Sequence, residues 1–427
     1  MTPAGLQQTF NEAMGQLLGP EFPAEIALAV SGGGDSMAML YLAHNWTHVY
    51  GVRLNVVTVD HGLRAESAAE AAMVSEECAA LGWPHTTLRW HWDGQGNLMD
   101  AARRGRLALI DSWRGPIRDV LMAHTQDDVA ETFVMRLARG SGVDGLSAMA
   151  AQRDVGDMRV IRPLLAMSRQ DLRHHLRTLH GRWAEDPSNQ DDRYERARVR
   201  KLLAALQGDG IDTAGLAATA GRMARAQTAL RARAAQVWNA IGHEGQALGV
   251  PTGDIRLDRD GFAAVEAETQ LRLLAGALQY VSGAAYRPRV SALEPLLERL
   301  LSGGSGTLLG CEALCGPKGI RIQREFNVLA DMETRVGGPT LWDGRWQVAH
   351  PDLTGLAVRA LGDEGWRQVA EKPAGAPPHA LARTLPAVWD GAQLVACDAL
   401  AVGPGQTTRL APPPPAAGGF GHFLLSH

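Results

Sequence analysis

The chain has 427 residues, of which 45% are hydrophobic and 21% are charged, as in ordinary soluble globular proteins of two or three domains. The formal net charge of −4 gives no overall indication of nucleic-acid binding, and four cysteines without a C-x-x-C pair exclude a disulfide framework and argue against a zinc ribbon. The sequence shows neither a basic secretory leader nor an uninterrupted apolar stretch of about 18 residues, so a cytoplasmic protein with no membrane partner is expected.

The first part of the chain alternates between expected strands and expected helices. Helices are expected at 4–19, 66–81, 98–110 and 127–139, and strands at 26–30, 53–59, 85–92 and 120–123. This βαβα alternation predicts a doubly wound parallel sheet of the α/β class. Ligands of such sheets bind at the carboxyl ends of the strands, and polar clusters at Ser31, Asp60 and His124 all fall there.

The first of these clusters is Ser31-Gly32-Gly33-Gly34-Asp35-Ser36, between an apolar strand and an expected helix. Glycines allow close approach of a phosphate, and the unpaired N–H groups of the first helical turn attract an anion. The alternative is an ordinary βα turn capped by Asp35 or Ser36. No lysine precedes Lys201, so this is not the Walker loop, and the G-x-G-x-x-G fingerprint is not met. The order Ser-Gly-Gly-x-Asp-Ser resembles instead the PP-loop of ATP pyrophosphatases, which cleave ATP between the α and β phosphates.

Two further features flank the expected nucleotide site. Asp60-His61-Gly62-Leu63-Arg64 closes the second expected strand and fits a loop around an adenosine, with an ordinary surface loop as an equal alternative. On the helix at 98–110, Arg103 and Arg106 are three residues apart and share a face, which suits phosphates or a carboxylate. Taken alone, a solvated basic face is the better interpretation of this pair.

The third cluster follows the strand at 120–123. His124 ends that strand, and Asp127, Asp128 and Glu131 open the next helix. Acids in a first helical turn are favoured by the helix dipole, so capping is one interpretation. Three acids beside a phosphate site would otherwise repel ATP, and a Mg²⁺ ion or a cationic substrate would remove that conflict.

Beyond residue 200 the composition shifts toward Ala, Arg and Leu. Helices are expected at 214–241, 261–281 and 289–301, with a glycine break at 303–306 and short strands from 307 on. Asp343-Gly344 and Asp390-Gly391 predict two hairpins, and the tail containing Pro412–Pro415 is typical of a loosely ordered extension. These shifts predict three domains, at 1–205, 206–305 and 306–427, the last one β-rich.

One segment is strongly basic although the whole chain is not. Between Arg193 and Arg233 nine Lys or Arg residues stand against three acids, which gives this segment a charge of +6. Nearly all of them are arginine, which suits bidentate phosphate contacts, although a coding bias toward arginine is an alternative. A local nucleic-acid-binding surface is expected there.

Taken together, these blocks closely resemble the tRNA(Ile)-lysidine synthetase family, in that family's order and spacing across residues 26–200. The matching stretches are Ser31–Ser36, Asp60–Arg64 with Ser67 and Glu70, His124–Thr132, Arg139–Leu146, Arg162–Leu165, and Glu185–Asn189 with Asp191, Arg196 and Arg200. The later helical and β-rich regions match that family in architecture more than in motifs. One departure is Thr125, where a second histidine is common in the family.

The resemblance implies a Rossmann-like PP-loop ATPase domain, followed by a helical domain and a β-rich C-terminal domain. It implies that the arginine-rich stretch 193–233 and the β-rich domain bind tRNA. It implies that ATP activates the C2 carbonyl oxygen of the wobble cytidine in the CAU anticodon of tRNA(Ile), with loss of pyrophosphate. The ε-amine of free L-lysine then attacks C2, and AMP leaves. ATP and Mg²⁺ are the implied cofactors, tRNA(Ile) and free lysine are the implied partners, and a homodimer is left open.

The resemblance also implies roles for individual residues. The implied ATP-binding residues are Ser31, Gly32, Gly33, Gly34, Asp35, Ser36, Asp60, His61, Arg64, His124 and Gly140, and the implied metal ligands are Asp35 and Asp127. The implied lysine-binding residues are Arg103, Arg106, Asp128 and Glu131. Asp35, Asp128 and Glu131 are the expected catalytic residues, and Arg196, Arg198 and Arg200 the expected tRNA-binding residues.

Three alternatives stay open at this point. A PP-loop tRNA thiolase would commonly use cysteines for sulfur transfer or a cluster, and the chain lacks a C-x-x-C pair. An amidating pyrophosphatase such as an NAD or GMP synthetase would need neither the arginine-rich segment nor the C-terminal domains. A non-catalytic tRNA-binding protein is disfavoured by the intact Ser-Gly-Gly-x-Asp-Ser motif and the acids at 127, 128 and 131.

Overall fold

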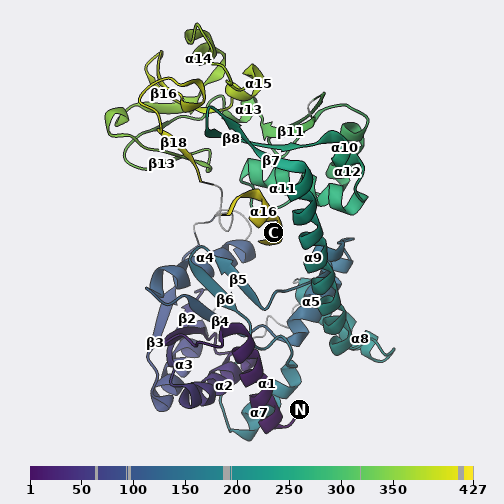
Figure 1. Cartoon of the computed structure of the whole chain (residues 1–427). Helices are drawn as coiled ribbons and strands as arrows, with labels where there is room; N and C mark the ends of the chain where they lie inside the picture. The colour runs from purple at the N-terminus through teal and green to yellow at the C-terminus, as the bar shows by residue number, and fades with distance from the viewer. Residues whose placement is uncertain are drawn as a thin grey trace. The chain divides into compact units, whose positions relative to one another are not determined.

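The computed structural model of the chain describes residues 1–62, 66–92, 94, 98–185, 193, 195–317, 319–411 and 418–426. It divides into two compact units, Met1–Gln227 and Thr228–His427, and the long helix α9 (Thr213–Ile241) runs through the division (Figure 1). Within the described residues, no helix combines the length and the apolar character that crossing a membrane requires.

The first unit is built on a six-stranded sheet. Its strands are β1 (Glu25–Ala29), β2 (Arg53–Asp60), β3 (His85–Arg89), β4 (Asp119–Met122), β5 (Gln152–Val155) and β6 (Met158–Ile161), in the order β3-β2-β1-β4-β6-β5. Neighbouring strands are parallel except β5, which pairs antiparallel with β6. The strand order reverses between β1 and β4, so the carboxyl ends of these two strands form the topological switch point where such sheets bind ligands.

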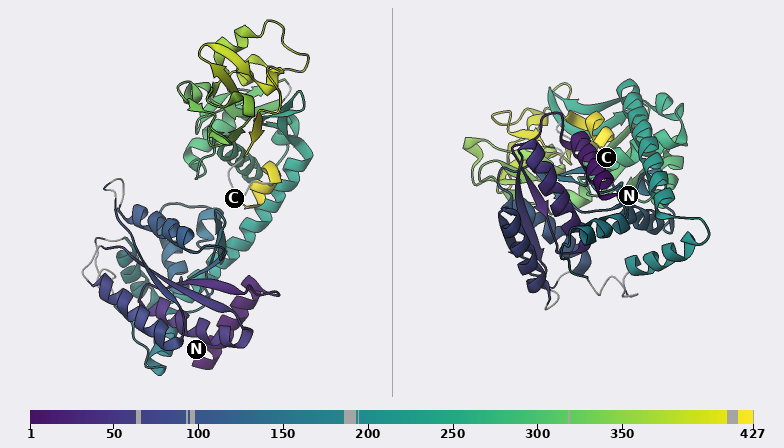
Figure 2. Two further views of the ribbon diagram at one scale, coloured as in Figure 1. Left: turned by 90° about the vertical axis from the view of Figure 1, so that its left-hand side faces the viewer. Right: turned by 90° about the horizontal axis from the view of Figure 1, so that it is seen from below.

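Helices lie on both faces of this sheet (Figure 2). They are α1 (Pro3–Leu18), α2 (Gly34–Tyr50), α3 (Ser67–Leu81), α4 (Leu98–Trp113), α5 (Gln126–Leu137), α6 (Val143–Leu146), α7 (Arg169–Thr178) and α8 (Glu195–Gln207). Alternate residues of β1 enter two different cores, because side chains of a strand alternate between faces. Ile26 and Leu28 pack with α1, α2 and α7, whereas Ala27 and Ala29 pack in the core that contains Ile110 of α4. This burial on both sides explains why β1 is apolar throughout.

The second unit contains an antiparallel sheet, covered by helices, and two smaller sheets. The main sheet has β7 (Gly242–Ala247), β8 (Val250–Leu257), β9 (Gly306–Leu308), β10 (Cys311–Gly316) and β11 (Gly319–Arg324), in the order β7-β8-β11-β10-β9. One smaller sheet contains β12 (Thr334–Arg335), β15 (Ala357–Ala360), β16 (Pro386–Asp390) and β17 (Gln393–Ala396). The other contains β13 (Thr340–Trp342), β14 (Trp346–Val348) and β18 (Thr408–Leu410). The helices are α10 (Arg259–Ala263), α11 (Ala267–Ser282), α12 (Val290–Leu301), α13 (Phe326–Leu329), α14 (Gly362–Gln368), α15 (His379–Ala382) and α16 (Gly419–Ser426), with short 3₁₀ turns at Pro351–Leu353 and Asp398–Leu400.

The predicted α/β class with a doubly wound parallel sheet, helices and later β-sheets is confirmed. Both predicted hairpins are present, as β13–β14 around Asp343-Gly344 and as β16–β17 around Asp390-Gly391. The structure adds the β7–β8 hairpin, which sequence analysis missed inside the region expected to be helical. Because β8 pairs with β11, hydrogen bonds cross position 305, where a domain boundary is expected. The three-domain division stays a prediction.

The prediction of a loose tail is wrong for its last part. Pro412–Pro415 lie outside the described residues, but α16 is a helix with three buried apolar side chains. Phe420, Phe423 and Leu424 join the core formed with Trp238 of α9 and Tyr280 of α11. Their spacing of three and four residues is the helical pattern that the glycines before them obscured.

Candidate active site

The loop between β1 and α2 has a fixed internal geometry. Gly32 has φ of +86°, which only glycine adopts without strain, and its carbonyl oxygen accepts a hydrogen bond of 2.9 Å from the Ala184 N–H. Gly33 is the N-cap of α2 and caps it with no side chain, so the N–H groups of the first turn are left for another acceptor. This part of the site has the form expected of an anion-binding loop.

Ser36 holds this loop from the inside. Its hydroxyl is buried, donates to the carbonyl oxygen of Gly33 over 2.9 Å and accepts from the N–H of Ser31 over 3.1 Å. The hydroxyl of Ser31 lies 3.2 Å from it, and Ser31 itself is exposed. The two serines are therefore not equivalent. The Ser36 hydroxyl makes hydrogen bonds inside the loop, whereas Ser31 is exposed to solvent.

The start of α5 is held by a capping box. The hydroxyl of Thr125 accepts from the N–H of Asp128 at 3.4 Å, and Asp128 Oδ2 accepts from the N–H and the hydroxyl of Thr125 at 2.9 and 3.0 Å. The capping interpretation of these acids is thus correct for Asp128. It also gives a structural role to Thr125, the position where the sequence departs from the family that it resembles.

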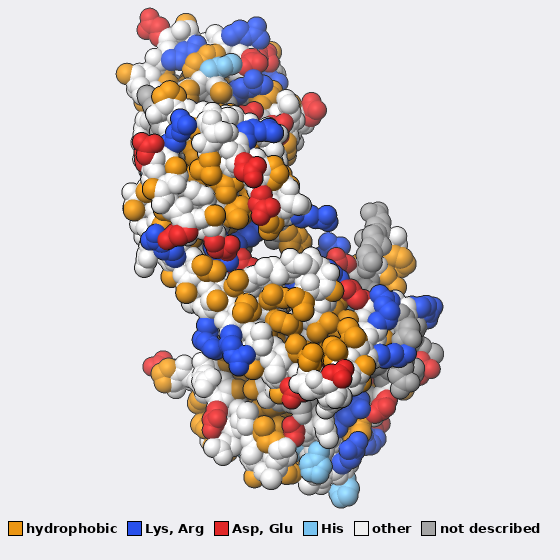
Figure 3. Space-filling view, turned by 90° about the vertical axis from the view of Figure 1, so that its right-hand side faces the viewer, with side chains coloured by type: hydrophobic (Ala, Val, Ile, Leu, Met, Phe, Trp, Pro, Cys, Tyr) orange, Lys and Arg blue, Asp and Glu red, His pale blue; other side chains and the backbone are white. Residues whose placement is uncertain are grey.

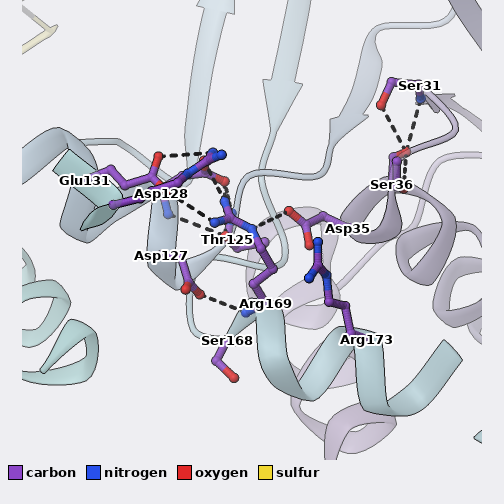
Figure 4. A network of polar contacts seen from close by, with 12 residues as sticks. Ser31, Asp35, Ser36, Thr125, Asp127, Asp128, Glu131, Ser168, Arg169 and Arg173 are labelled. Atoms are coloured by element: carbon purple, nitrogen blue, oxygen red, sulfur yellow. Dashed lines mark hydrogen bonds and ion pairs between the residues drawn. The ribbon is translucent and has the colours of Figure 1, made fainter. Parts of the chain in front are cut away.

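The side chain of Arg169, the first residue of α7, lies between the PP-loop and α5 (Figure 4). Its guanidinium contacts three carboxylates, with Nε 3.1 Å from Asp35 Oδ2, Nη1 3.2 Å from Glu131 Oε1 and Nη2 3.4 Å from Asp128 Oδ1. Its backbone N–H donates to Asp127 Oδ2 over 2.7 Å. All four predicted acids therefore meet at one residue that sequence analysis did not single out.

Helix α8 brings two more arginines to the same acids. Arg200 Nε donates to Glu131 Oε1 over 2.6 Å, and Arg196 Nη1 lies 3.7 Å from Asp128 Oδ1. These two arginines are four residues apart and share one face of the helix, whereas Arg198 is exposed and donates to the Arg193 carbonyl oxygen at 3.4 Å. Glu131 is 1% exposed, so it is a buried charge that needs these partners.

Burial and the arginines act on the pKa values of these acids in opposite directions. Burial raises the pKa of Asp35 above its ordinary value, although Arg169 acts to lower it. Burial also works to raise the pKa of Asp128, but Arg169, the Thr125 N–H and Arg196 together bring the pKa below the ordinary range. Asp35 is therefore less readily ionised than Asp128.

His124 lies at the end of β4 in a basic environment. Burial, followed by the charge of Arg162, lowers the pKa of His124 to about 4, so its ring is neutral at physiological pH. Its Nδ1 is buried without a hydrogen-bond partner among the described residues. Arg162 is itself buried, donates to the Ala150 carbonyl oxygen over 2.7 Å, and has a pKa lowered by burial to about 10.

The end of β2 lies beside α4. Asp60 Oδ1 accepts from the Gly62 N–H over 2.8 Å, and hydrogen bonds from Ser67 and Gly62 lower the pKa of Asp60. The ring of His61 packs edge-on against Trp90, and burial and the charge of Arg106 lower the pKa of His61. The charge of Arg106 on α4 also acts to lower the pKa of His124, so Arg106 is within electrostatic range of both histidines.

The structure thus brings most predicted site residues to one edge of the sheet. Arg169 joins Asp35 of the loop to Asp127, Asp128 and Glu131, and Arg196 and Arg200 contact the last two. His124 lies within electrostatic range of Asp128, and Arg106 within that of His124 and His61. Arg103 is exposed on α4, and Gly140 (φ of +68°) lies in the turn after α5, where Arg136 donates to the carbonyl oxygens of Gly145 and Ala148. Arg64 and the stretch 186–192 lie outside the described residues.

Arg169 could have been noticed in the sequence. It follows Ser168, an N-cap whose hydroxyl accepts from the Asp171 N–H, so it stands in the first turn of α7. A cation in a first turn is opposed by the helix dipole and needs compensating acids.

No cluster of three or more His, Cys, Asp or Glu residues with the arrangement of a metal site occurs within the described part of the chain.

Comparisons with known proteins give the following relatives. The family described as a PP-loop domain matches residues 6–206. A tRNA(Ile)-lysidine synthase of Ruegeria pomeroyi is 40% identical over 415 residues, which cover 95% of this chain and 96% of that protein. One from a Bradyrhizobium species is 41% identical over 283 residues, which cover 64% of this chain and 79% of that protein. Among solved structures, a U34-tRNA thiolase from Methanococcus maripaludis aligns with a TM-score of 0.44 and 16% identity over 52% of this chain and 80% of that one.

Proposed function

The chain belongs to the tRNA(Ile)-lysidine synthase family, and from this premise we propose that it joins lysine to C2 of the wobble cytidine of tRNA(Ile) in an ATP-dependent reaction. The C2 oxygen of the cytidine attacks the α-phosphate of ATP, and pyrophosphate leaves. The ε-amine of free lysine then attacks C2, the C2–O bond breaks, and AMP leaves. The proposal includes the CAU anticodon as the target and the cytoplasm as the place of reaction.

The observation that mainly supports this assignment is that an anion-binding loop and a pair of carboxylates lie together at the switch point between β1 and β4. The anion-binding loop at Ser31–Ser36 is joined through one side chain to the carboxylates of Asp128 and Glu131. A phosphate-binding loop next to a carboxylate pair suits a reaction that uses ATP and an amine together.

In the first half-reaction the PP-loop binds the phosphates. The outward hydroxyl of Ser31 and the free N–H groups at the start of α2 would donate to phosphate oxygens. Asp60, His61, His124 and Gly140 would bound the nucleotide, and the neutral His124 ring can accept or donate a hydrogen bond without adding charge. Arg64 lies outside the described residues, so only its position in the sequence supports its proposed role in binding ATP.

Asp35 fits a role as a magnesium ligand. Its Oδ1 is buried with no hydrogen-bond partner among the described residues, while Arg169 holds its Oδ2. Mg²⁺ typically takes one or two protein carboxylates and completes its shell with phosphate and water oxygens. Asp35, with Asp127 as a second candidate, would hold the ion, whose charge would offset that of the pyrophosphate leaving group.

In the second half-reaction Asp128 and Glu131 would receive the lysine ε-ammonium, and one of them would accept a proton as the amine becomes a nucleophile. Arg106, with Arg103, would meet the lysine carboxylate. The exposed cations of the segment 193–233, among them Arg198, would contact tRNA phosphates. Exposed Lys and Arg side chains are present on each unit taken by itself (Figure 3).

The assignment is tested by incubating the protein with ATP, labelled lysine and transcribed tRNA(Ile) carrying CAU. We expect label in tRNA and equimolar AMP and pyrophosphate. Transcribed tRNA(Met), which has the same anticodon, serves as the specificity control. Release of AMP without label in the tRNA would contradict the proposal.

The lysine role of the α5 acids calls for isosteric variants, because Asp128 also caps the helix. We expect Asp128→Asn and Glu131→Gln to retain tRNA-dependent ATP–pyrophosphate exchange but to lose lysine transfer by about 10²-fold, the scale of a lost general base. If exchange and transfer fall together while the apparent lysine affinity is unchanged, these acids serve the nucleotide or its metal instead.

A further inference from the structure

The carboxylates proposed to bind lysine already hold a cation in the free protein. Arg169 contacts Asp128 and Glu131 of α5 and Asp35 of the PP-loop with three different nitrogens of one guanidinium (Figure 4). Its side chain is 20% exposed, so these contacts form in a partly dry environment where ion pairs are stronger than at the surface. The guanidinium occupies the place that an incoming ammonium would need.

The charges of the cluster nearly balance in this state. Asp35, Asp127, Asp128 and Glu131 carry four negative charges, and Arg169, Arg196 and Arg200 carry three positive ones, which leaves −1. Arg196 and Arg200 approach from α8 and contact α5 acids. Arg169 approaches from α7 and contacts acids of both α2 and α5, so it is placed between the phosphate side and the lysine side.

We infer that Arg169 is an internal substitute for the lysine ammonium, which keeps the α5 carboxylates neutralised while ATP binds and is displaced from them when lysine enters. This inference rests on the proposed function. A cation at this point lowers the repulsion between the acids and the ATP phosphates. The same cation competes with lysine for Asp128 and Glu131, so lysine binds well only when Arg169 can turn away.

The inference predicts opposite effects on the two substrates when the guanidinium is removed. In Arg169→Gln the cluster charge goes from −1 to −2, because one cation is lost from the set just counted. We expect the KM for lysine to fall and the KM for ATP to rise, each on the order of fivefold to tenfold, the size of effect that a partly exposed charge pair can have. A residue that only braces the site would worsen both constants.

The experiment measures both KM values in full-length protein with tRNA(Ile). Arg177→Gln removes the same charge from an exposed position of the same helix and is the matched control, for which both constants should match wild type. Arg169→Lys keeps one cation but cannot reach three carboxylates at once, so its lysine KM should lie between those of wild type and Arg169→Gln. If Arg169→Gln does not fold, the lysine KM of Arg169→Lys tests the inference, because it should be lower than that of wild type.

The outcomes separate the inference from the function on which it rests. If wild type transfers lysine and the variants show an unchanged or raised lysine KM, the internal-substitute role is wrong and the function stands. If wild type transfers no lysine to tRNA, the proposed function itself fails. A lowered lysine KM together with a raised ATP KM supports both.

Discussion

Ser31 and Ser36 stand five residues apart on one loop, and their hydroxyl groups have different surroundings. Ser36 is buried and bonded to Gly33 and to the Ser31 N–H, whereas Ser31 is exposed. We expect Ser36→Ala to lower the free energy of unfolding by about 1 kcal/mol and to impair pyrophosphate release, because the loop loses two hydrogen bonds. Ser31→Ala should slow pyrophosphate release, up to about 10²-fold, without changing stability.

Urea unfolding and tRNA-dependent pyrophosphate release, measured on both variants, test this division. Equal loss of stability in the two variants would show that both hydroxyls are structural. Normal pyrophosphate release in both would remove the loop from the phosphate site.

The neutral ring of His124 makes stability depend on pH. Its pKa is about 4 in the folded chain, and an unfolded chain has the ordinary value of 6.5, so the unfolded state takes up a proton first as the pH falls. This stability is fully present above pH 6.5 and is lost as the pH falls from 6.5 toward 4. Between pH 7 and pH 5 wild type should lose up to about 2 kcal/mol more than His124→Gln.

Urea midpoints of the two proteins at both pH values measure this difference. His61 and His175, whose pKa values are also lowered by burial, are common to both proteins and cancel in the comparison. Parallel loss of stability in wild type and His124→Gln would contradict the assignment of this titration to His124.

At the scale of residues, the acids of the site could be predicted from the sequence, but the side chain that holds them together could not. Asp35, Asp128 and Glu131 lie in local motifs whose spacing is visible in the chain. The partner that joins them is Arg169, 134 residues beyond Asp35, and only the packing of α7 against α2 brings the two together. Likewise, two of the three arginines expected to bind tRNA, Arg196 and Arg200, contact site carboxylates.

Among the helices, α5 depends on its first turn. The capping box of Thr125 and Asp128 satisfies two orphan donors and also fixes the direction of the Asp128 carboxylate. We expect Thr125→Ala to destabilise the protein by about 0.5–2 kcal/mol, the usual cost of a lost N-cap, while Thr125→Ser stays near wild type.

The measurement is urea unfolding together with amide exchange at the start of α5. Because the Asp128 carboxylate loses its hydroxyl donor, lysine transfer should weaken more than pyrophosphate exchange in Thr125→Ala. Unchanged exchange protection at residues 126–129 would show that the cap contributes little.

At the scale of the whole molecule, the sheet could be predicted and the second unit only partly. Apolar runs such as 26–30 are buried on both faces, so their pattern was clear. The β7–β8 hairpin was missed because β7 is rich in Gly and polar residues and is followed by a turn at Leu248, a non-glycine residue with φ of +53°. Long-range pairing, not local propensity, makes β8 a strand.

The division into units gives a prediction for tRNA binding. We expect residues 1–227, which keep most of the basic segment but lack the β-rich second unit, to bind ATP and to hold tRNA more weakly than the full chain, whose affinity should fall steeply with salt. A cut at 210 should be less stable, because Leu216, Ala217 and Ala220 of α9 pack with Val129 and Phe133 of α5. Measurements of tRNA binding at several salt concentrations test both fragments. Full tRNA affinity in either fragment would contradict the prediction that tRNA binding requires the second unit.

The burial of α16 has a consequence for the synthesis of the protein. All of the first unit precedes residue 228, so a ribosome can deliver it complete while the rest is still being translated. The second unit is different, since Phe420 of α16 contacts the rings of Trp238 and Tyr280, and Phe423 contacts Tyr280. Until α16 has left the exit tunnel, Trp238 and Tyr280 lack the aromatic side chains that cover them in the folded protein. A chain that stops before α16 therefore exposes Trp238 and Tyr280 to the proteases that degrade incomplete products.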